Sequence, residues 1–172
     1  MNQAEKYYKE IKKKFETKDT KEILNTLKEI RVSGQANIIP LLFEILESSK
    51  EKSISEEIVS ILSQLKDKTC VPYVVKALKE NEIKNFKKEI ITSCWQSGLD
   101  YSEHITLFAK EFIRNDYVTA IEAFTVIEEW IFESGPEKVT ECKNYLINAV
   151  SDVSADKKPL YVELVKLVES YL

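Results

Sequence analysis

The chain has 172 residues, of which 44% are hydrophobic and 31% are charged, and it contains only 3 glycines and 4 prolines. This composition excludes a disordered chain and offers little material for tight β-turns or flexible linkers. The length, together with the abundance of Glu, Lys, Leu and Ile, instead predicts one ordered helical domain over residues 1–172.

The charge is distributed unevenly along the chain. The net charge is -4, with a balance of +3 over residues 1–98 and of -7 over residues 99–172. Because an acidic half with few arginines is unsuited to a phosphate backbone, we expect no nucleic-acid partner. No apolar run approaches the length of a membrane span, so we expect a soluble protein that does not act at membranes.

The cysteines suggest a reducing compartment. Cys70, Cys94 and Cys142 lie far apart with no C-x-x-C spacing, and each lies among apolar residues, where a free cysteine behaves as a small hydrophobe. The odd count and the missing disulfide framework, together with an N-terminus that has no apolar leader, predict a cytoplasmic location.

Polar breaks divide the chain into segments with the apolar period of a helix. Since short breaks join antiparallel neighbours in bundles and solenoids, we predict about ten helices in five antiparallel pairs. The first helices of the pairs are predicted over residues 2–17, 37–48, 69–80, 102–114 and 136–150, and the second helices over 20–33, 53–65, 83–97, 117–133 and 156–171.

The first helix is amphipathic and basic. Tyr7, Tyr8, Ile11 and Phe15 form one side, and the run 12–14 of three lysines lies on the other. Such a helix can contact a membrane or an acidic partner. We favour a capping helix, because the ends of a repeat array need a polar outer face, and we expect the last helix, 156–171, to be the other cap.

One segment of the chain repeats. The stretch 37–46 returns 32 residues later as 69–78 with its proline in the same place, and a third copy 34 residues further on has His104 in place of the proline. A fixed period of this length in helical units is typical of a solenoid. We expect the recurring apolar positions in the core: Ile39, Leu42, Phe43 and Leu46, then Val71, Val74, Val75 and Leu78, then Ile105, Phe108, Ala109 and Phe112.

The segment 65–80, followed by an amphipathic helix that ends near Gly98, resembles a HEAT repeat. The resemblance is to the HEAT/armadillo repeat class and is clearest over residues 34–114. It implies an all-α, right-handed α–α superhelix, a HEAT-like solenoid. Asn37 and Thr69 are predicted to be N-caps, which places Pro40 and Pro72 in the first turn of their helices.

In HEAT-like solenoids the second helices usually line the concave side, so the resemblance implies that a ligand contacts those helices. On the helix 53–65, positions i, i+4 and i+8 share a face, and offsets of 32 and 34 residues carry them to the next two second helices. We expect these positions to align as a patch that is polar at one end and aromatic and acidic at the other: Glu56, Ser60 and Gln64, then Lys88, Thr92 and Gln96, then Glu122, Val126 and Trp130.

Trp130 lies among three glutamates, Glu128, Glu129 and Glu133. A partly exposed Trp beside carboxylates would anchor a basic or apolar peptide; the alternative is that Trp130 packs beneath the last helix pair. We hypothesise that Glu122, Glu129, Trp130 and Glu133 dominate binding of a basic or amphipathic protein or peptide. The oligomeric state stays open, with self-association through an edge of the array as one possibility.

The sequence predicts no catalytic residue, metal site or cofactor. His104 is the only histidine, zinc-ligand spacing is absent, and no phosphate-binding glycine motif occurs. We therefore predict a non-catalytic protein-interaction or scaffold module. The alternative is an enzyme or nucleic-acid-processing factor on the same scaffold, since some proteins with HEAT-like repeats act on DNA or are lyases that attach bilin pigments, an argument from fold analogy.

Overall fold

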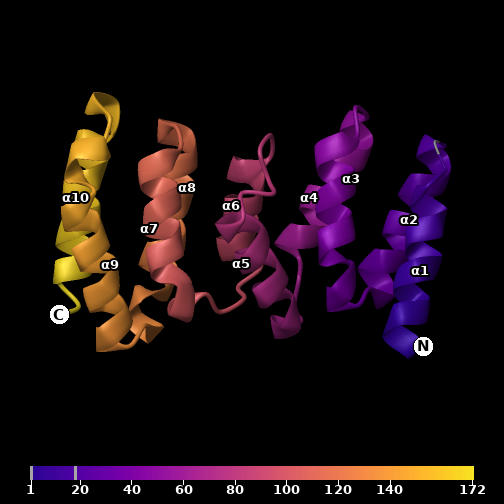
Figure 1. Cartoon of the computed structure of the whole chain (residues 1–172), viewed down its shortest axis with the longest axis horizontal. Helices are drawn as coiled ribbons and strands as arrows, with labels where there is room; N and C mark the ends of the chain where they lie inside the picture. The colour runs from indigo at the N-terminus through magenta and orange to yellow at the C-terminus, as the bar shows by residue number, and fades with distance from the viewer. Residues whose placement is uncertain (1, 18) are drawn as a thin grey trace. The chain divides into compact units, whose positions relative to one another are not determined.

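The computed structural model describes residues 2–17 and 19–172 (Figure 1). Within these residues it contains ten α-helices, six short 3-10 helices and no strand, which confirms the all-α fold class. The α-helices are α1 (Gln3–Phe15), α2 (Thr20–Ser33), α3 (Ile39–Ser48), α4 (Lys52–Ser63), α5 (Val71–Lys79), α6 (Lys87–Gln96), α7 (Ile105–Arg114), α8 (Tyr117–Trp130), α9 (Pro136–Asn148) and α10 (Lys158–Glu169). The 3-10 helices are η1 (Ala36–Ile38), η2 (Lys68–Cys70), η3 (Ser102–His104), η4 (Ile131–Glu133), η5 (Val150–Asp152) and η6 (Ala155–Lys157).

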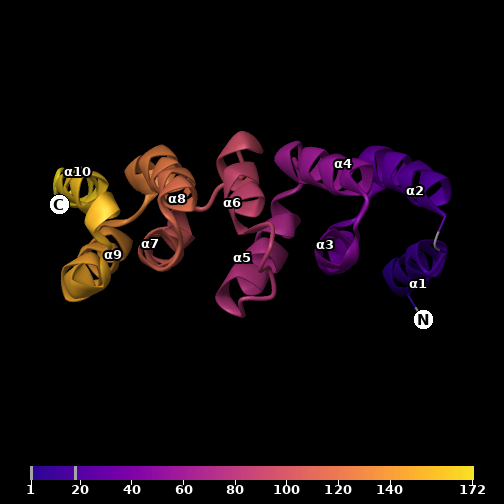
Figure 2. The ribbon, with the colours of Figure 1, turned by 90° about the horizontal axis from the view of Figure 1, so that it is seen from above.

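The chain divides into two compact units, Met1–Phe86 and Lys87–Leu172. In the first unit, α2 packs against α1 and α4, and α3 packs against α4 and α5. Seen from above in Figure 2, α2 and α4 form one layer of this unit, and α1, α3 and α5 form the other. Helices that are next but one along the chain therefore lie in the same layer.

The second unit has the same alternation. Helix α7 packs against α8 and α9, α6 packs against α8, and α10 packs against α9 and α8. Figure 2 shows α6, α8 and α10 in one layer of the unit and α7 and α9 in the other. Helix α8 is the middle helix of its layer, so neighbours cover it on several sides.

The apolar positions of the repeat form the core of both units. All twelve are buried, with exposed fractions between 0% and 7%. Those of the first two copies lie on α3 and α5, and those of the third copy lie on α7. Because burying one large apolar side chain contributes about 1.5–3 kcal/mol, the repeat is explained by the packing of these helices.

The two prolines lie in the first turns of α3 and α5, as predicted, where the missing N–H has no partner within the helix. The predicted N-caps are wrong, because a 3-10 turn precedes each of these helices. Before α5, the carboxylate of Asp67 accepts the N–H of Thr69 at 2.9 Å. Before α3, the Asn37 side chain instead donates to the carbonyl of Ala4 at 3.1 Å.

One predicted helix start is wrong by four residues. The helix expected from residue 83 begins at Lys87, whereas all other predicted ends agree to within three residues. Ile83 is buried as its apolar pattern suggested. However, the carboxylate of Glu47 accepts the N–H groups of residues 84–86 at 3.1–3.3 Å and the side-chain amide of Asn85 at 2.8 Å. These bonds hold the segment in a non-helical conformation.

Candidate functional site

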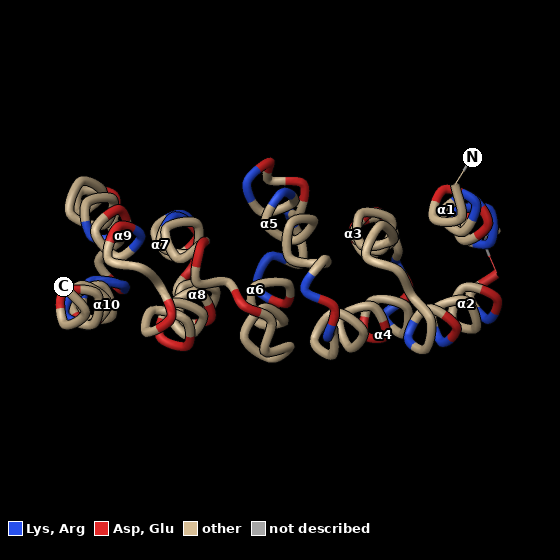
Figure 3. Tube along the Cα trace, turned by 90° about the horizontal axis from the view of Figure 1, so that it is seen from below, with Lys and Arg blue, Asp and Glu red and all other residues tan. Residues whose placement is uncertain are grey.

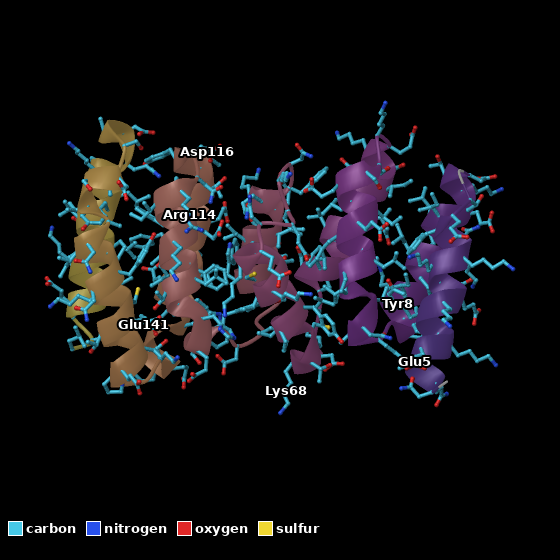
Figure 4. All side chains as sticks on the ribbon, in the orientation of Figure 1. Glu5, Tyr8, Lys68, Arg114, Asp116 and Glu141 are labelled. Carbon is cyan, nitrogen blue, oxygen red and sulfur yellow. The ribbon has the colours of Figure 1, made fainter. Side chains whose placement is uncertain are left out.

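Helix α8 in the second unit carries the candidate site, and Asp116 fixes where this helix begins (Figure 4). The Asp116 carboxylate accepts the N–H of Thr119 at 2.8 Å. This bond lowers the pKa of Asp116 below its usual value. An aspartate N-cap satisfies a backbone donor that has no partner within the helix. The start of α8 is therefore set by its own sequence.

A buried lysine holds the turn between α7 and α8. Lys157 is 2% exposed, and its Nζ donates to the carbonyls of Phe112, Ile113 and Asn115 at 2.7–2.9 Å. Burial lowers the pKa of Lys157, and the charges of Asp156 and Asp116 oppose that shift. The last carbonyls of a helix lack hydrogen-bond partners within it. The Lys157 ammonium provides such partners at the end of α7, although it lies 42 to 45 residues further along the chain.

A second buried group stabilises the same turn. Glu111 is 3% exposed, and its carboxylate lies 3.3 Å from Nζ of Lys87 in a buried ion pair. The same carboxylate accepts the side-chain amide of Asn115 at 2.9 Å. Since Asn115 also binds Lys157 through its carbonyl, one polar network connects α6, α7, η6 and the residue just before Asp116.

The outward face of α8 is apolar. Its buried residues are Thr119, Ala120, Ala123, Val126 and Ile127. On the opposite side, Val118 and Ile121 are 53% and 39% exposed, and Phe132 in η4 is 76% exposed. With about 100° per residue, Val118, Ile121, Thr125 and Phe132 fall within about 60° of one another, next to the half-exposed Tyr117. We call these five residues the α8 stripe: Tyr117, Val118, Ile121, Thr125 and Phe132.

Carboxylates lie along one side of the α8 stripe and within it. With about 100° per residue, Glu122 and Glu129 project on the side of Val118, Glu128 falls in line with the stripe between Thr125 and Phe132, and Glu133 lies just beyond α8. Residues 116–133 contain one Asp, four Glu and neither Lys nor Arg, and Figure 3 shows acidic positions along α8 without a basic one. We call these four residues the acidic border: Glu122, Glu128, Glu129 and Glu133.

Two of the site residues predicted on α8 do not face outward. Val126 is fully buried, which makes its assignment to a partner-binding patch wrong. Trp130 is half-buried, and its Nε1 is enclosed without a hydrogen-bond partner among the described residues. The reason is geometric: four residues turn about 400°, so an i, i+4, i+8 series drifts about 40° at each step. The series that starts at Glu122 therefore turns toward the core at Val126 and Trp130.

The residues predicted on α6 are mostly polar and outward. Lys88 is exposed and lies 3.5 Å from the carboxylate of Glu89. Gln96 is exposed, and Thr92 is half-buried with its hydroxyl donating to the Lys88 carbonyl at 2.8 Å. A contact that no local pattern indicated joins this helix to α8: Nε1 of Trp95 donates to Glu122 at 2.9 Å.

The predicted residues on α4 belong to the first unit. Glu56 is exposed and lies 3.3 Å from Lys52. The Ser60 hydroxyl accepts Nη2 of Arg31 and the Gln64 amide, both at 3.0 Å. Arg31 also pairs with Glu57 at 2.9 Å. Ser60 and Gln64 therefore bind each other, and Ser60 also binds Arg31, so their polar groups already have partners within the protein.

A cavity of ≈ 280 Å³ opens beside Gln64 in the first unit. Its wall is apolar where Ile38, Leu42, Ile61 and Cys70 contribute, and Arg31 lies at its edge. Burial raises the pKa of the Cys70 thiol to about 11, so this thiol is not activated as a nucleophile. The cavity is an apolar hollow next to a cation that is already paired.

The exposed apolar residues of α8 were not predicted, because the apolar pattern of this segment was interpreted only as core. A helical projection of 117–132 would have found them, since Val118, Ile121 and Phe132 lie opposite Ala120, Ala123 and Ile127. Among the described residues, no cluster of three or more His, Cys, Asp or Glu side chains is arranged to hold a metal ion. The same residues include no helix with the length and apolar character needed to span a membrane.

Comparison with family models, with curated proteins and with solved structures finds no match to this chain. The surface of the protein is therefore the remaining indication of its function. An exposed apolar stripe with a single-sign charged border marks a place where another molecule can bind.

Proposed function

We propose that this protein is a non-catalytic protein-interaction module that binds a partner protein or peptide through the outward face of α8. The observation that carries the proposal is the exposure of Phe132, Ile121 and Val118 on one face of α8 and η4, a face that also carries carboxylates. Exposed apolar patches with polar rims mark interaction sites, and aromatic residues are enriched at the centres of interfaces.

We further propose that the ten helices form a right-handed, HEAT-like solenoid of five pairs. The period of 32 to 34 residues and the burial of every recurring apolar position support this arrangement, as does the alternation of layers within each unit. In this arrangement α8 is a second helix of a pair. A cytoplasmic setting accords with three buried cysteines that are all free thiols.

Site-specific photo-cross-linking tests the proposal. A photoreactive phenylalanine analogue replaces Thr125, in the middle of the α8 stripe, and in a control protein replaces Thr140, an exposed threonine on α9. Irradiation in native lysate should give a discrete adduct from position 125 that is absent from position 140, and mass spectrometry identifies the protein joined. Equal adducts from both positions, or none from position 125, would contradict the proposal.

A further inference from the structure

The length and width of the α8 stripe restrict the shape of the partner surface that can bind it. From Tyr117 to Phe132 the stripe follows the helix axis for about 22 Å at about 1.5 Å per residue. It is one helix face wide, with Glu122 and Glu129 along one side and Glu128 in line with it near the C-terminal end of α8. A surface of this form matches the face of one amphipathic helix of about four turns, whose apolar row packs along the stripe.

The backbone of α8 excludes the main alternative mode of peptide binding. An extended peptide gains affinity by pairing its main chain with a free strand edge, and no strand occurs among residues 2–17 and 19–172. Along a helix the N–H and C=O groups are already paired within it. Recognition at this surface must therefore come from side chains, which favours a partner that presents a regular row of them.

The charges determine the polar face of the partner. All four carboxylates of the acidic border lie within or just after α8, and Glu128, Glu129 and Glu133 gather at its C-terminal end. The end of a helix also carries partial negative charge. Lysines or arginines that flank the apolar row of the partner would meet these groups, and most of them would lie over the end of α8 where Phe132 is exposed.

A second copy of this chain that meets the first through its own α8 or α1 does not provide such a helix. Two α8 stripes facing each other would oppose carboxylate to carboxylate, which costs free energy. Helix α1 is basic, yet Ile11 and Phe15 are buried in its own unit, and Tyr7 and Tyr8 are half-buried. Its exposed face is mostly polar and would leave Phe132 largely uncovered.

We infer that the α8 stripe and its acidic border bind a single amphipathic α-helix with Lys and Arg residues flanking its apolar row. This inference rests on the proposed function and specifies the partner at the same surface. Binding is expected to weaken with salt because opposite charges contribute, and to persist in part at high salt because the centre of the contact is apolar.

The test uses synthetic probes and the whole 15N-labelled protein. One peptide of about 18 residues, about 27 Å long as a helix, places Leu along one face and Lys beside it. A second has the same composition in scrambled order, and a third has Glu in place of Lys. The amphipathic basic peptide should shift amide resonances of residues 117–133. Its affinity should fall about tenfold with Phe132→Asp and not with Val162→Asp, a substitution at an exposed apolar position on α10.

The outcomes separate this inference from the proposed function. Equal binding of the scrambled peptide would overturn the helical partner, and binding of the Glu peptide would overturn its charge. Failure of the amphipathic basic peptide to perturb residues 117–133 would also overturn the inference, whereas an adduct from position 125 would still support an interaction surface. If position 125 gives no adduct, the proposed function is wrong, and the inference that rests on it fails as well.

Discussion

Helices α7 and α8 pack against each other and yet use their side chains in opposite ways. Eight of the ten residues of α7 are buried, including the charged Glu111. Only five of the fourteen residues of α8 are buried, and its outward side continues into Phe132, which is 76% exposed. Folding engages nearly every side chain of α7, whereas one face of α8 remains available for another molecule.

The comparison predicts that substitutions in the two helices affect different measurements. A change on α7, or in the network around its C-terminal end, should lower the free energy of unfolding. A change on the α8 stripe should leave stability unchanged and weaken binding. The following variants test this difference, beginning with the largest expected loss of stability.

Glu111→Ala should be the most destabilising of these variants. It leaves the buried ammonium of Lys87 without this carboxylate and removes an acceptor from Asn115. Removing one partner of a buried ion pair costs about 3–5 kcal/mol, and denaturant unfolding would measure that loss. The matched control is Glu128→Ala on the exposed face of α8, which should change stability by less than about 0.5 kcal/mol. Equal losses of stability in the two variants would contradict the proposed difference between α7, whose side chains are needed for folding, and the exposed face of α8.

Lys157→Met should come next. Methionine keeps the apolar stem and removes the ammonium, so three carbonyls at the end of α7 lose their donor. A hydrogen bond to a charged group contributes about 1.5–3 kcal/mol, and we expect a loss of about 2–3 kcal/mol. Amide exchange in the first turn of α8 should become faster as well. Unchanged exchange there would mean that Lys157 does not hold the turn between the helices.

Asp116→Ala should cost about 1 kcal/mol, the usual contribution of an N-cap, and Asp116→Asn should cost little, because asparagine caps equally well. The bond from the Thr119 N–H lowers the pKa of Asp116 in the folded protein. Its stabilisation is therefore present above the pKa of an unfolded aspartate and is lost as pH falls through the lowered folded value. Unfolding followed between pH 7 and acid should show this loss in the wild type and not in Asp116→Asn.

The residues of the core could be predicted from the sequence, because they recur at the spacing of an α-helix within short segments. The recurring apolar positions from Ile39 to Phe112 are all buried, since side chains spaced at 3.6 residues share one face. The start of α6 could not be predicted from its own segment, because the groups that keep residues 84–86 out of the helix come from Glu47, nearly forty residues earlier.

The candidate site was predicted less well, for two physical reasons. The acidic character of α8 can be read from composition, and the structure leaves Glu129 and Glu133 exposed and Glu122 half-buried. The register that chose Val126 and Trp130 instead turns toward the core. Contacts between distant residues leave no local pattern. Lys157, beside Lys158 near the start of a predicted helix, is typical of a surface lysine, and only the folded unit brings it to the end of α7.

The role of the α8 stripe can be measured as the affinity of the protein cross-linked at position 125 for three forms of this chain: wild type, Phe132→Asp and Val162→Asp. Both substitutions replace an exposed apolar side chain, so both should leave the free energy of unfolding within about 0.5 kcal/mol of the wild type. We expect Phe132→Asp to weaken binding at least about tenfold, a loss of about 1.4 kcal/mol, while Val162→Asp binds as the wild type does. Unchanged binding of a stably folded Phe132→Asp variant would contradict this role of the α8 stripe.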